Sequence, residues 1–221
     1  MSDRHGDDLH DGGDARRRFL ERVRAAVAAH PGKSAAPDYP DEIAFARSTA
    51  LAPDDRVPRF RERLEAAHGR VFTDAGALAD WLAAQGARHG YCDPLLLPAV
   101  AAACARAVPG PVTLETALDR ARIDDYRFGI TRAAGAIAET GTIILDDALT
   151  SRRLAALAPW IHVAVLSPEG IHAHVADAIG ALGADPNVIW CTGPSKTADV
   201  EGILIEGVHG PGEQLALIVA L

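Results

Sequence analysis

The chain has 221 residues, and the 48% that are hydrophobic are enough to form the core of one large domain, which excludes a generally disordered protein. Its formal net charge of −8 gives no reason to expect a nucleic acid or an anionic membrane surface as a partner. Three widely spaced cysteines without a C-x-x-C spacing predict reduced thiols in a cytoplasmic protein, with no iron–sulfur or zinc framework in this chain.

Residues 1–58 are predicted to form a mobile tail, a helix and a proline-rich arm. The helix would begin at Asp14 and end at Ala29, because His30-Pro31-Gly32 stops it and an apolar residue recurs every four positions before that point. Prolines recur between Pro31 and Pro58, which excludes a long helix or a central strand. We interpret this segment as an arm that lies on the domain or on a partner subunit. The apolar positions of the helix are Phe19, Val23 and Val27.

Residues 59–221 are predicted to form one α/β domain, because short apolar strands alternate with helical segments. The predicted strands are 71–72, 88–92, 112–114, 143–145, 161–166, 188–191, 203–205 and 215–221. The predicted helices are 60–68, a helix capped by Thr73 or Asp74 and closed by Gly86, 95–107, a short one at 117–122, and one after Pro168 that carries Ile171, Val175, Ile179 and Leu182. This order predicts a three-layer sandwich around a largely parallel sheet.

The stretch from Asn187 to Gly212 holds two polar, glycine-bearing loops between apolar strands. In the first loop, Gly193–Thr197, backbone N–H groups, two hydroxyls and one ammonium follow a strand, which favours a phosphate or carboxylate site. The alternative is an ordinary Gly-Pro turn with polar groups in solvent. The spacing of a Walker A loop and that of a dinucleotide-binding glycine motif are both absent.

A second informative stretch, Gly129–Leu145, contains small residues followed by Glu139-Thr140-Gly141-Thr142. Glu139 could act as a nucleophile or general base at the entry to a strand; the alternative is a helix-terminal carboxylate in a tightly packed loop. We expect this turn and the loop after residue 191 to meet at the carboxyl edge of one sheet, in a pocket for an anion. The predicted anion-binding residues are Thr140, Gly141, Thr142, Gly193, Ser195, Lys196, Thr197 and Gly210.

Three further residues are candidates for acid–base chemistry. Asp199 and Glu201 would face the same side of an extended segment, and crowding would raise the pKa of one of them; the alternative is a pair of solvated charges. His209, in a Gly/Pro turn, could protonate a substrate oxygen or simply be structural. The remaining histidines show no metal-ligand spacing, so no metal is predicted. His172 and His174 would lie two apart on a helix and at the surface, and Trp160 and Trp190 would lie in the core.

Together these stretches resemble the lactate utilisation protein C family of LUD-domain proteins. The resemblance covers about Phe60 to Leu221. A lysine stands at position 196, where many relatives would carry arginine, so the charge is kept but the bidentate fork is lost. The matching segments are Gly129-Ile130-Thr131, Ala138-Glu139-Thr140-Gly141-Thr142, Gly193-Pro194-Ser195-Lys196-Thr197-Ala198-Asp199-Val200-Glu201 and Gly207-Val208-His209-Gly210-Pro211.

The resemblance implies a fold like that of sugar-phosphate isomerases and CoA transferases. It implies a bacterial L-lactate oxidation system in which this chain is a non-redox subunit without a cofactor of its own and partner subunits carry the iron–sulfur clusters. Two other hypotheses stay open. The chain could be a stand-alone CoA-transferase-like or sugar-phosphate-isomerase-like enzyme, or it could be a binding or assembly module whose arm docks on a partner. Separately, the chain could form a homo-oligomer.

Overall fold

The computed structural model describes residues 11–29, 51–150, 153–183, 187–198 and 204–220. Internal contacts divide the chain into two units, Met1–Arg47 and Ser48–Leu221. In the first unit, α1 (Asp11–Ala29) is the predicted helix, and the side chains of its apolar stripe are exposed. Most of the proline-rich segment lies outside the described residues, so the interpretation as an arm stays a prediction.

The second unit is organised around a six-stranded sheet in which every pair of neighbouring strands is parallel. This confirms the predicted α/β fold with a largely parallel sheet. The strand order is β1-β12-β7-β4-β2-β3. The strands are β1 (Arg70–Phe72), β2 (His89–Cys92), β3 (Thr113–Glu115), β4 (Phe128–Arg132), β7 (Ile161–Leu166) and β12 (Glu213–Ile218).

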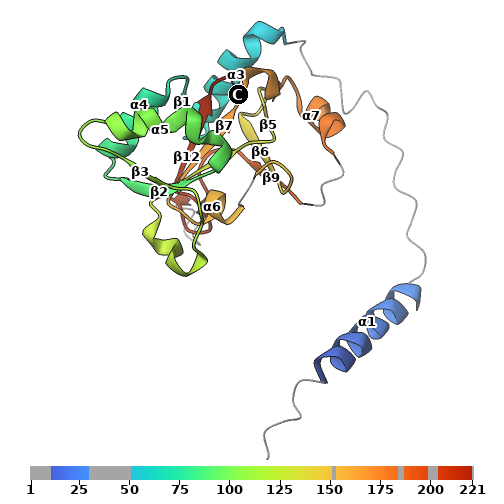
Figure 1. Ribbon diagram of the computed structural model, residues 1–221. Helices are drawn as coiled ribbons and strands as arrows, with labels where there is room; N and C mark the ends of the chain where they lie inside the picture. Colours follow the sequence, from blue (N-terminus) through green and yellow to red (C-terminus); the bar gives the residue numbers. More distant parts are fainter. Residues whose placement is uncertain (1–10, 30–50, 151–152, 184–186, 199–203, 221) are drawn as a thin grey trace, which may run out of the picture. The chain divides into compact units, whose positions relative to one another are not determined.

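Helices α4 (Ala75–Ala84) and α5 (Leu97–Arg106) cover one face of this sheet (Figure 1). Helix α4 begins where predicted, because the Asp74 carboxylate accepts a hydrogen bond of 2.7 Å from the backbone N–H of Ala77. Apolar side chains of the helices and of alternate strand positions form the larger core.

The opposite face packs against a second sheet and is also contacted by α3 (Arg56–Ala66) and α6 (Arg153–Leu157). Its strand order is β8-β5-β6-β9, with antiparallel pairing between β5 and β6 and between β6 and β9. Helix α7 (Val175–Ala181) covers the outer side of this second sheet (Figure 1). The strands are β5 (Gly135–Ile137), β6 (Thr142–Asp146), β8 (Ile171–His172) and β9 (Val188–Cys191).

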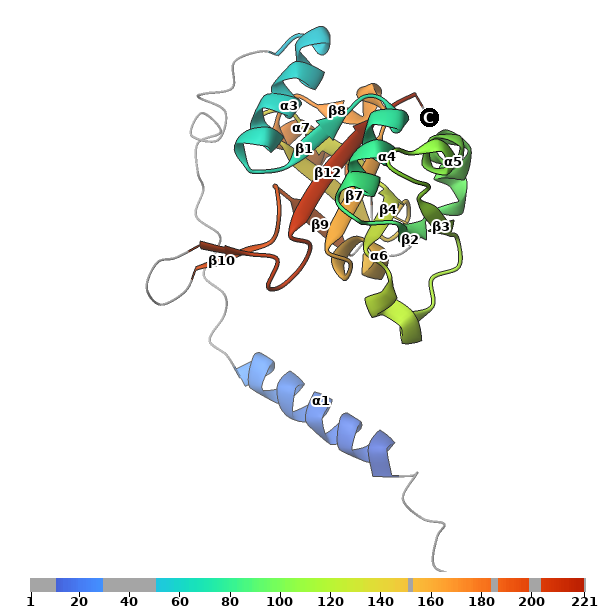
Figure 2. The ribbon, with the colours of Figure 1, turned by 90° about the vertical axis from the view of Figure 1, so that its left-hand side faces the viewer.

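A two-stranded antiparallel ribbon, β10 (Lys196–Ala198) and β11 (Leu204–Glu206), extends from the body of the domain (Figure 2). Strand β10 overlaps the predicted loop Gly193–Thr197. Short 3-10 turns complete the unit at Pro53–Asp55, Pro94–Leu96, Arg120–Asp125 and Pro168–Gly170. Along the described residues, no helix combines the length and the apolar character needed to cross a membrane.

Several further predictions about local structure were wrong. The central strand β4 was missed, because its glycine and polar residues hide a strand whose first four residues are buried. The helix predicted after Pro168 begins only at Val175, since Ile171 and His172 form strand β8 and His174 caps the helix. Trp160 and Trp190 are not core residues: they are 50% and 36% exposed.

Candidate functional site

The two glycine-bearing motifs, Glu139–Thr142 and the loop Gly193–Thr197, meet through hydrogen-bonded threonine hydroxyls. The Oγ1 atom of Thr142 lies 2.6 Å from Oγ1 of Thr140 and 2.7 Å from Oγ1 of Thr192. The antiparallel pairing of β6 with β9 causes this meeting, because it places Ile143 opposite Cys191 and so brings the start of one strand to the end of the other. The motifs are therefore neighbours although about 50 residues separate them.

Gly141 and Gly193 each allow their loop to pack closely against the C-terminal turn of α3. Gly141 and Gly193 have φ angles of 69° and 75°, a left-handed conformation that favours glycine. A Cβ atom on Gly141 would overlap the backbone of Leu64, and one on Gly193 would overlap the carbonyl oxygen of Ala67. Glycine is required at both positions by conformation and by close backbone approach.

A pocket of about 250 Å³ opens beside the second motif. It lies at the amino ends of β7 and β12, since α6 precedes the first strand and Gln214 is the second residue of the other. The expected position at the carboxyl edge of the sheet was wrong, because β6 and β9 belong to the second sheet rather than to the parallel one. The lining residues are Ala156, Leu157, Trp190, Cys191, Thr192, Gly193, Pro194, Ser195, His209, Gly210, Pro211 and Gln214.

Four of the predicted site residues line this pocket: Gly193, Ser195, His209 and Gly210. The turn that carries them is held by backbone hydrogen bonds, in which Ser195 N–H donates to the Pro211 carbonyl at 2.9 Å and Gly207 N–H donates to the Ser195 carbonyl at 2.8 Å. Thr140 and Thr142 do not line the pocket, but Thr142 contacts the lining residue Thr192, and Gly141 packs against the C-terminal turn of α3.

Gln214, which lines the pocket, is also the first of three hydrogen-bonded polar side chains that extend into the buried interior. Its Oε1 atom lies 3.0 Å from Nδ1 of His162, and Nε2 of His162 lies 2.9 Å from Oγ1 of Thr131. Burial lowers the pKa of His162 to about 4, so its imidazole is neutral at pH 7. The sequence did not indicate Gln214 or Thr131 as site residues, and His162 shows no metal-ligand spacing to the other histidines. The sequence pattern that could have indicated these three residues is a polar residue within an otherwise apolar strand.

Lys196 is used at the base of the ribbon rather than in the pocket lining. Its Nζ atom donates a hydrogen bond of 3.0 Å to the Ala67 carbonyl and lies 3.5 Å from Oε1 of Glu206. The hydrogen bond from His68, together with the charge of Lys196, holds the pKa of Glu206 below its usual value. These contacts attach the ribbon to the end of α3.

We therefore expect Lys196→Met to lower the free energy of unfolding by about 1–2 kcal/mol, because the Ala67 carbonyl loses a charged donor. Urea unfolding checks this, with Arg59→Met as the control, since Arg59 makes an exposed ion pair with Glu62 that should contribute little to stability. Unchanged stability in Lys196→Met would show that the ammonium is not needed for the ribbon.

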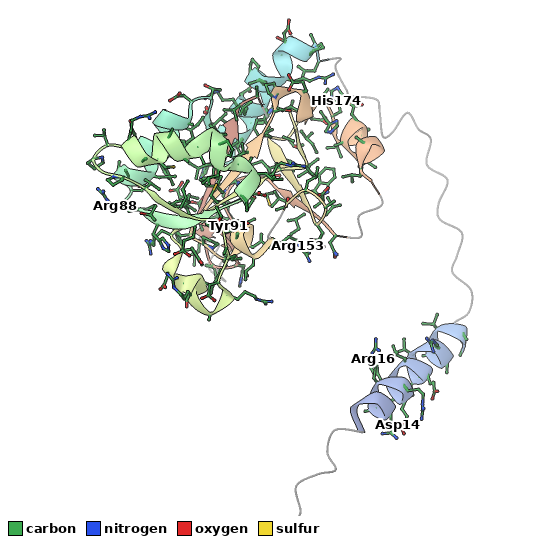
Figure 3. All side chains as sticks on the ribbon, viewed as in Figure 1. Asp14, Arg16, Arg88, Tyr91, Arg153 and His174 are labelled. Atoms are coloured by element: carbon green, nitrogen blue, oxygen red, sulfur yellow. The ribbon has the colours of Figure 1, made fainter. Side chains whose placement is uncertain are left out.

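The other predicted residues lie elsewhere or outside the described part of the chain. The Glu139 carboxylate accepts a hydrogen bond of 3.2 Å from Val175 N–H and lies 3.5 Å from Nδ1 of His174. Figure 3 labels His174, the residue that caps the N-terminus of α7. Thr197 lies in β10, opposite Ile205. Asp199 and Glu201 are outside the described residues, where their predicted role stays untested.

No group of three histidine, cysteine, aspartate or glutamate side chains in the described ranges is placed to hold a metal ion. His172 and His174, predicted to share a helix, instead lie in β8 and at the cap of α7, and both are partly buried. The side chains that line the pocket carry hydroxyl, thiol, amide and imidazole groups.

Comparison with known proteins identifies the family. The family model described as the LUD domain matches residues 100–219. Lactate utilization protein C of Deinococcus radiodurans is 36% identical over 110 residues, which cover 48% of this chain and 52% of that protein. The protein of the same name from Bacillus licheniformis is 30% identical over 106 residues, which cover 44% of each chain.

A crystal structure of a DUF162 family protein from Deinococcus radiodurans superposes with a TM-score of 0.55 at 27% identity, over 77% of this chain and 100% of that one. The present chain spans about half the length of the curated relatives it matches. The matched residues 100–219 include the strands of both motifs, the pocket lining and the buried polar row. This chain belongs to the LUD domain family.

Proposed function

We propose that this chain is a non-redox subunit of a bacterial L-lactate oxidation system and that its pocket binds a small carboxylate. Two kinds of support point the same way. Several relatives carry the name lactate utilization protein C. The pocket brings together groups that can donate hydrogen bonds to a carboxylate, and this convergence is the observation that carries the proposal.

The donors are the Ser195 hydroxyl, the Gln214 amide and the His209 ring. Among the described lining residues none is aspartate or glutamate, so no lining carboxylate repels an anion. A carboxylate accepts hydrogen bonds and cannot donate them, which matches this set. Trp190 and Leu157 supply apolar wall for a short alkyl group, and a volume of about 250 Å³ suits a molecule of few atoms.

The redox step is assigned to partner subunits. Oxidation of L-lactate to pyruvate releases two electrons and two protons, and iron–sulfur clusters in partners would accept the electrons. The cysteines of this chain lack the C-x-x-C spacing of cluster ligands, and in the described ranges they form no group placed to hold a metal. Three unpaired cysteines also fit a reducing cytoplasm.

The test is a calorimetric titration of the purified full chain with sodium L-lactate, with sodium phosphate as the comparison anion. We expect saturable lactate binding and an affinity about tenfold lower in Ser195→Ala, since one hydrogen bond to a charged group is removed. Thr197→Ala is the matched control, because Thr197 lies on the ribbon outside the pocket lining. Absence of lactate binding in the wild-type chain would contradict a carboxylate site.

A second experiment addresses the role as a subunit. Lactate oxidation would be measured in a reconstituted system of this chain with its iron–sulfur partners, with and without the chain. Equal rates in both samples would overturn the proposal. The alternative of a CoA-transferase-like enzyme acting through Glu139 has less support, because that carboxylate is engaged at the N-terminus of α7 and does not line the pocket. Incubation with an acyl-CoA followed by hydroxylamine is accordingly expected to give no adduct at Glu139.

A further inference from the structure

The polar row, defined as Thr131, His162 and Gln214, crosses three neighbouring strands of the parallel sheet. His162 and Gln214 are register partners on β7 and β12, and Thr131 lies on β4 two residues beyond the partner of His162. His162 and Gln214 point into the layer between the two sheets, because Ala164 and Ala216, two positions further along their strands, belong to that core. Thr131 meets His162 in the same layer. Each is at most 2% exposed, in a layer that is otherwise apolar.

The hydrogen bonds of the polar row can be satisfied in only one arrangement. Gln214 Nε2 lies 3.2 Å from the Leu215 carbonyl oxygen, which can only accept, so this end of the amide must be the –NH₂ group. The other end is then a carbonyl oxygen, and His162 must carry its proton on Nδ1 to donate to it over 3.0 Å. His162 Nε2 is therefore an acceptor, and the Thr131 hydroxyl donates to it over 2.9 Å.

This arrangement of donors and acceptors determines which group of the Gln214 amide is available to a ligand in the pocket. Its carbonyl end is held by His162, so the –NH₂ end is the one left for a ligand, and one of its two hydrogens has no other acceptor among the described residues. Gln214 is the member of the polar row that lines the pocket. Without His162, the Gln214 side chain could turn either its carbonyl or its –NH₂ group toward the pocket. Because His162 binds the carbonyl, the –NH₂ group, a hydrogen-bond donor, faces the ligand.

We propose that the polar row is a positioning device, in which Thr131 and His162 hold the Gln214 amide so that its N–H binds an acceptor oxygen of the ligand. The ligand class is therefore one with a carboxylate oxygen at the Gln214 side of the pocket. A ligand with only donor groups there would be rejected, because it would leave the amide hydrogen unpaired and face it with a second donor. This inference rests on the proposed function of the pocket as a carboxylate site.

The orientation of the amide can be tested without a ligand. In ¹⁵N-labelled full chain at pH 7, histidine side-chain NMR is expected to show His162 as the neutral tautomer with its proton on Nδ1. In Gln214→Leu that tautomer should lose its dominance, since the acceptor is gone. A wild-type His162 with its proton on Nε2 would overturn the inference, because the Gln214 amide would then have to point the other way.

The consequence for binding is tested with sodium L-lactate as the probe. Gln214→Glu should weaken binding more than 30-fold, because a carboxylate replaces the donor with an acceptor and adds repulsion. Thr131→Val should weaken it about threefold to tenfold, whereas Thr131→Ser, which keeps the hydroxyl, should restore wild-type affinity. A merely structural row would lower the melting temperature in Thr131→Val and leave the lactate affinity unchanged, which would count against positioning.

The two experiments separate failure of this inference from failure of the proposed function. If the wild-type chain binds no lactate while His162 carries its proton on Nδ1, the carboxylate site is refuted and the orientation of Gln214 stands. If lactate binds with equal affinity to the wild type and to Gln214→Glu, the carboxylate site stands and the positioning role of the polar row is refuted.

Discussion

Gly193→Ala is expected to lower the free energy of unfolding by about 3 kcal/mol or more, whereas Gly86→Ala should cost only about 1–2 kcal/mol. Both glycines have left-handed backbones, with φ of 75° at Gly193 and 71° at Gly86, so both variants incur the same conformational penalty. The two positions differ in the space available for a Cβ atom. A Cβ at Gly193 overlaps the Ala67 carbonyl oxygen, while one at Gly86 meets nothing within 4 Å.

Because the obstacle at Gly193 is backbone, no side-chain rotation relieves it, and either the turn or the end of α3 must move. Urea unfolding of the two variants beside the wild type measures the difference. Since Gly193 also lines the pocket, Gly193→Ala should weaken lactate binding, while Gly86→Ala should leave it unchanged. Equal destabilisation in both variants would show that the contact with α3 does not restrict the turn.

Acidification from pH 7 to pH 5 is expected to remove roughly 2 kcal/mol of stability through His162 alone. Burial lowers the pKa of this residue to about 4 from an ordinary value of 6.5. Between these values the unfolded chain binds a proton that the folded chain does not, so stability falls as the pH falls through this window. The hydrogen-bond partners of His162, Thr131 and Gln214, are neutral, so neither compensates a proton on the ring.

The measurement is the urea midpoint at a series of pH values, with His162→Gln as the comparison. The variant should be less stable at pH 7 but lose less stability on acidification, because the titrating group is absent. Glu115 and Glu206 should contribute little to the change in stability between pH 7 and pH 5. Hydrogen bonds from His89 and Tyr126 to Glu115, and from His68 to Glu206, lower the pKa of each carboxylate below 4.5, so their contributions are lost only at lower pH. An identical loss in His162→Gln would refute this assignment.

The sequence alone was sufficient for the α/β fold and for the two motifs. Strands β7 and β12 were predicted because their apolar runs are buried on both faces of a parallel sheet, which is a local pattern. The cap of α4 at Asp74 was also local. The motif glycines were recognisable because left-handed turns and close backbone approaches restrict those positions to glycine wherever the loop lies.

Tertiary structure alone decided where these pieces meet and what they contact. The pocket forms at the amino ends of β7 and β12 because β6 and β9 pair in a second sheet, and strand pairing depends on partners distant in the chain. Lys196 is directed to the Ala67 carbonyl by the packing of the ribbon on α3. The role of Gln214 depends on His162, 52 residues away, because a hydrogen bond between neighbouring strands leaves no periodic trace in either of them.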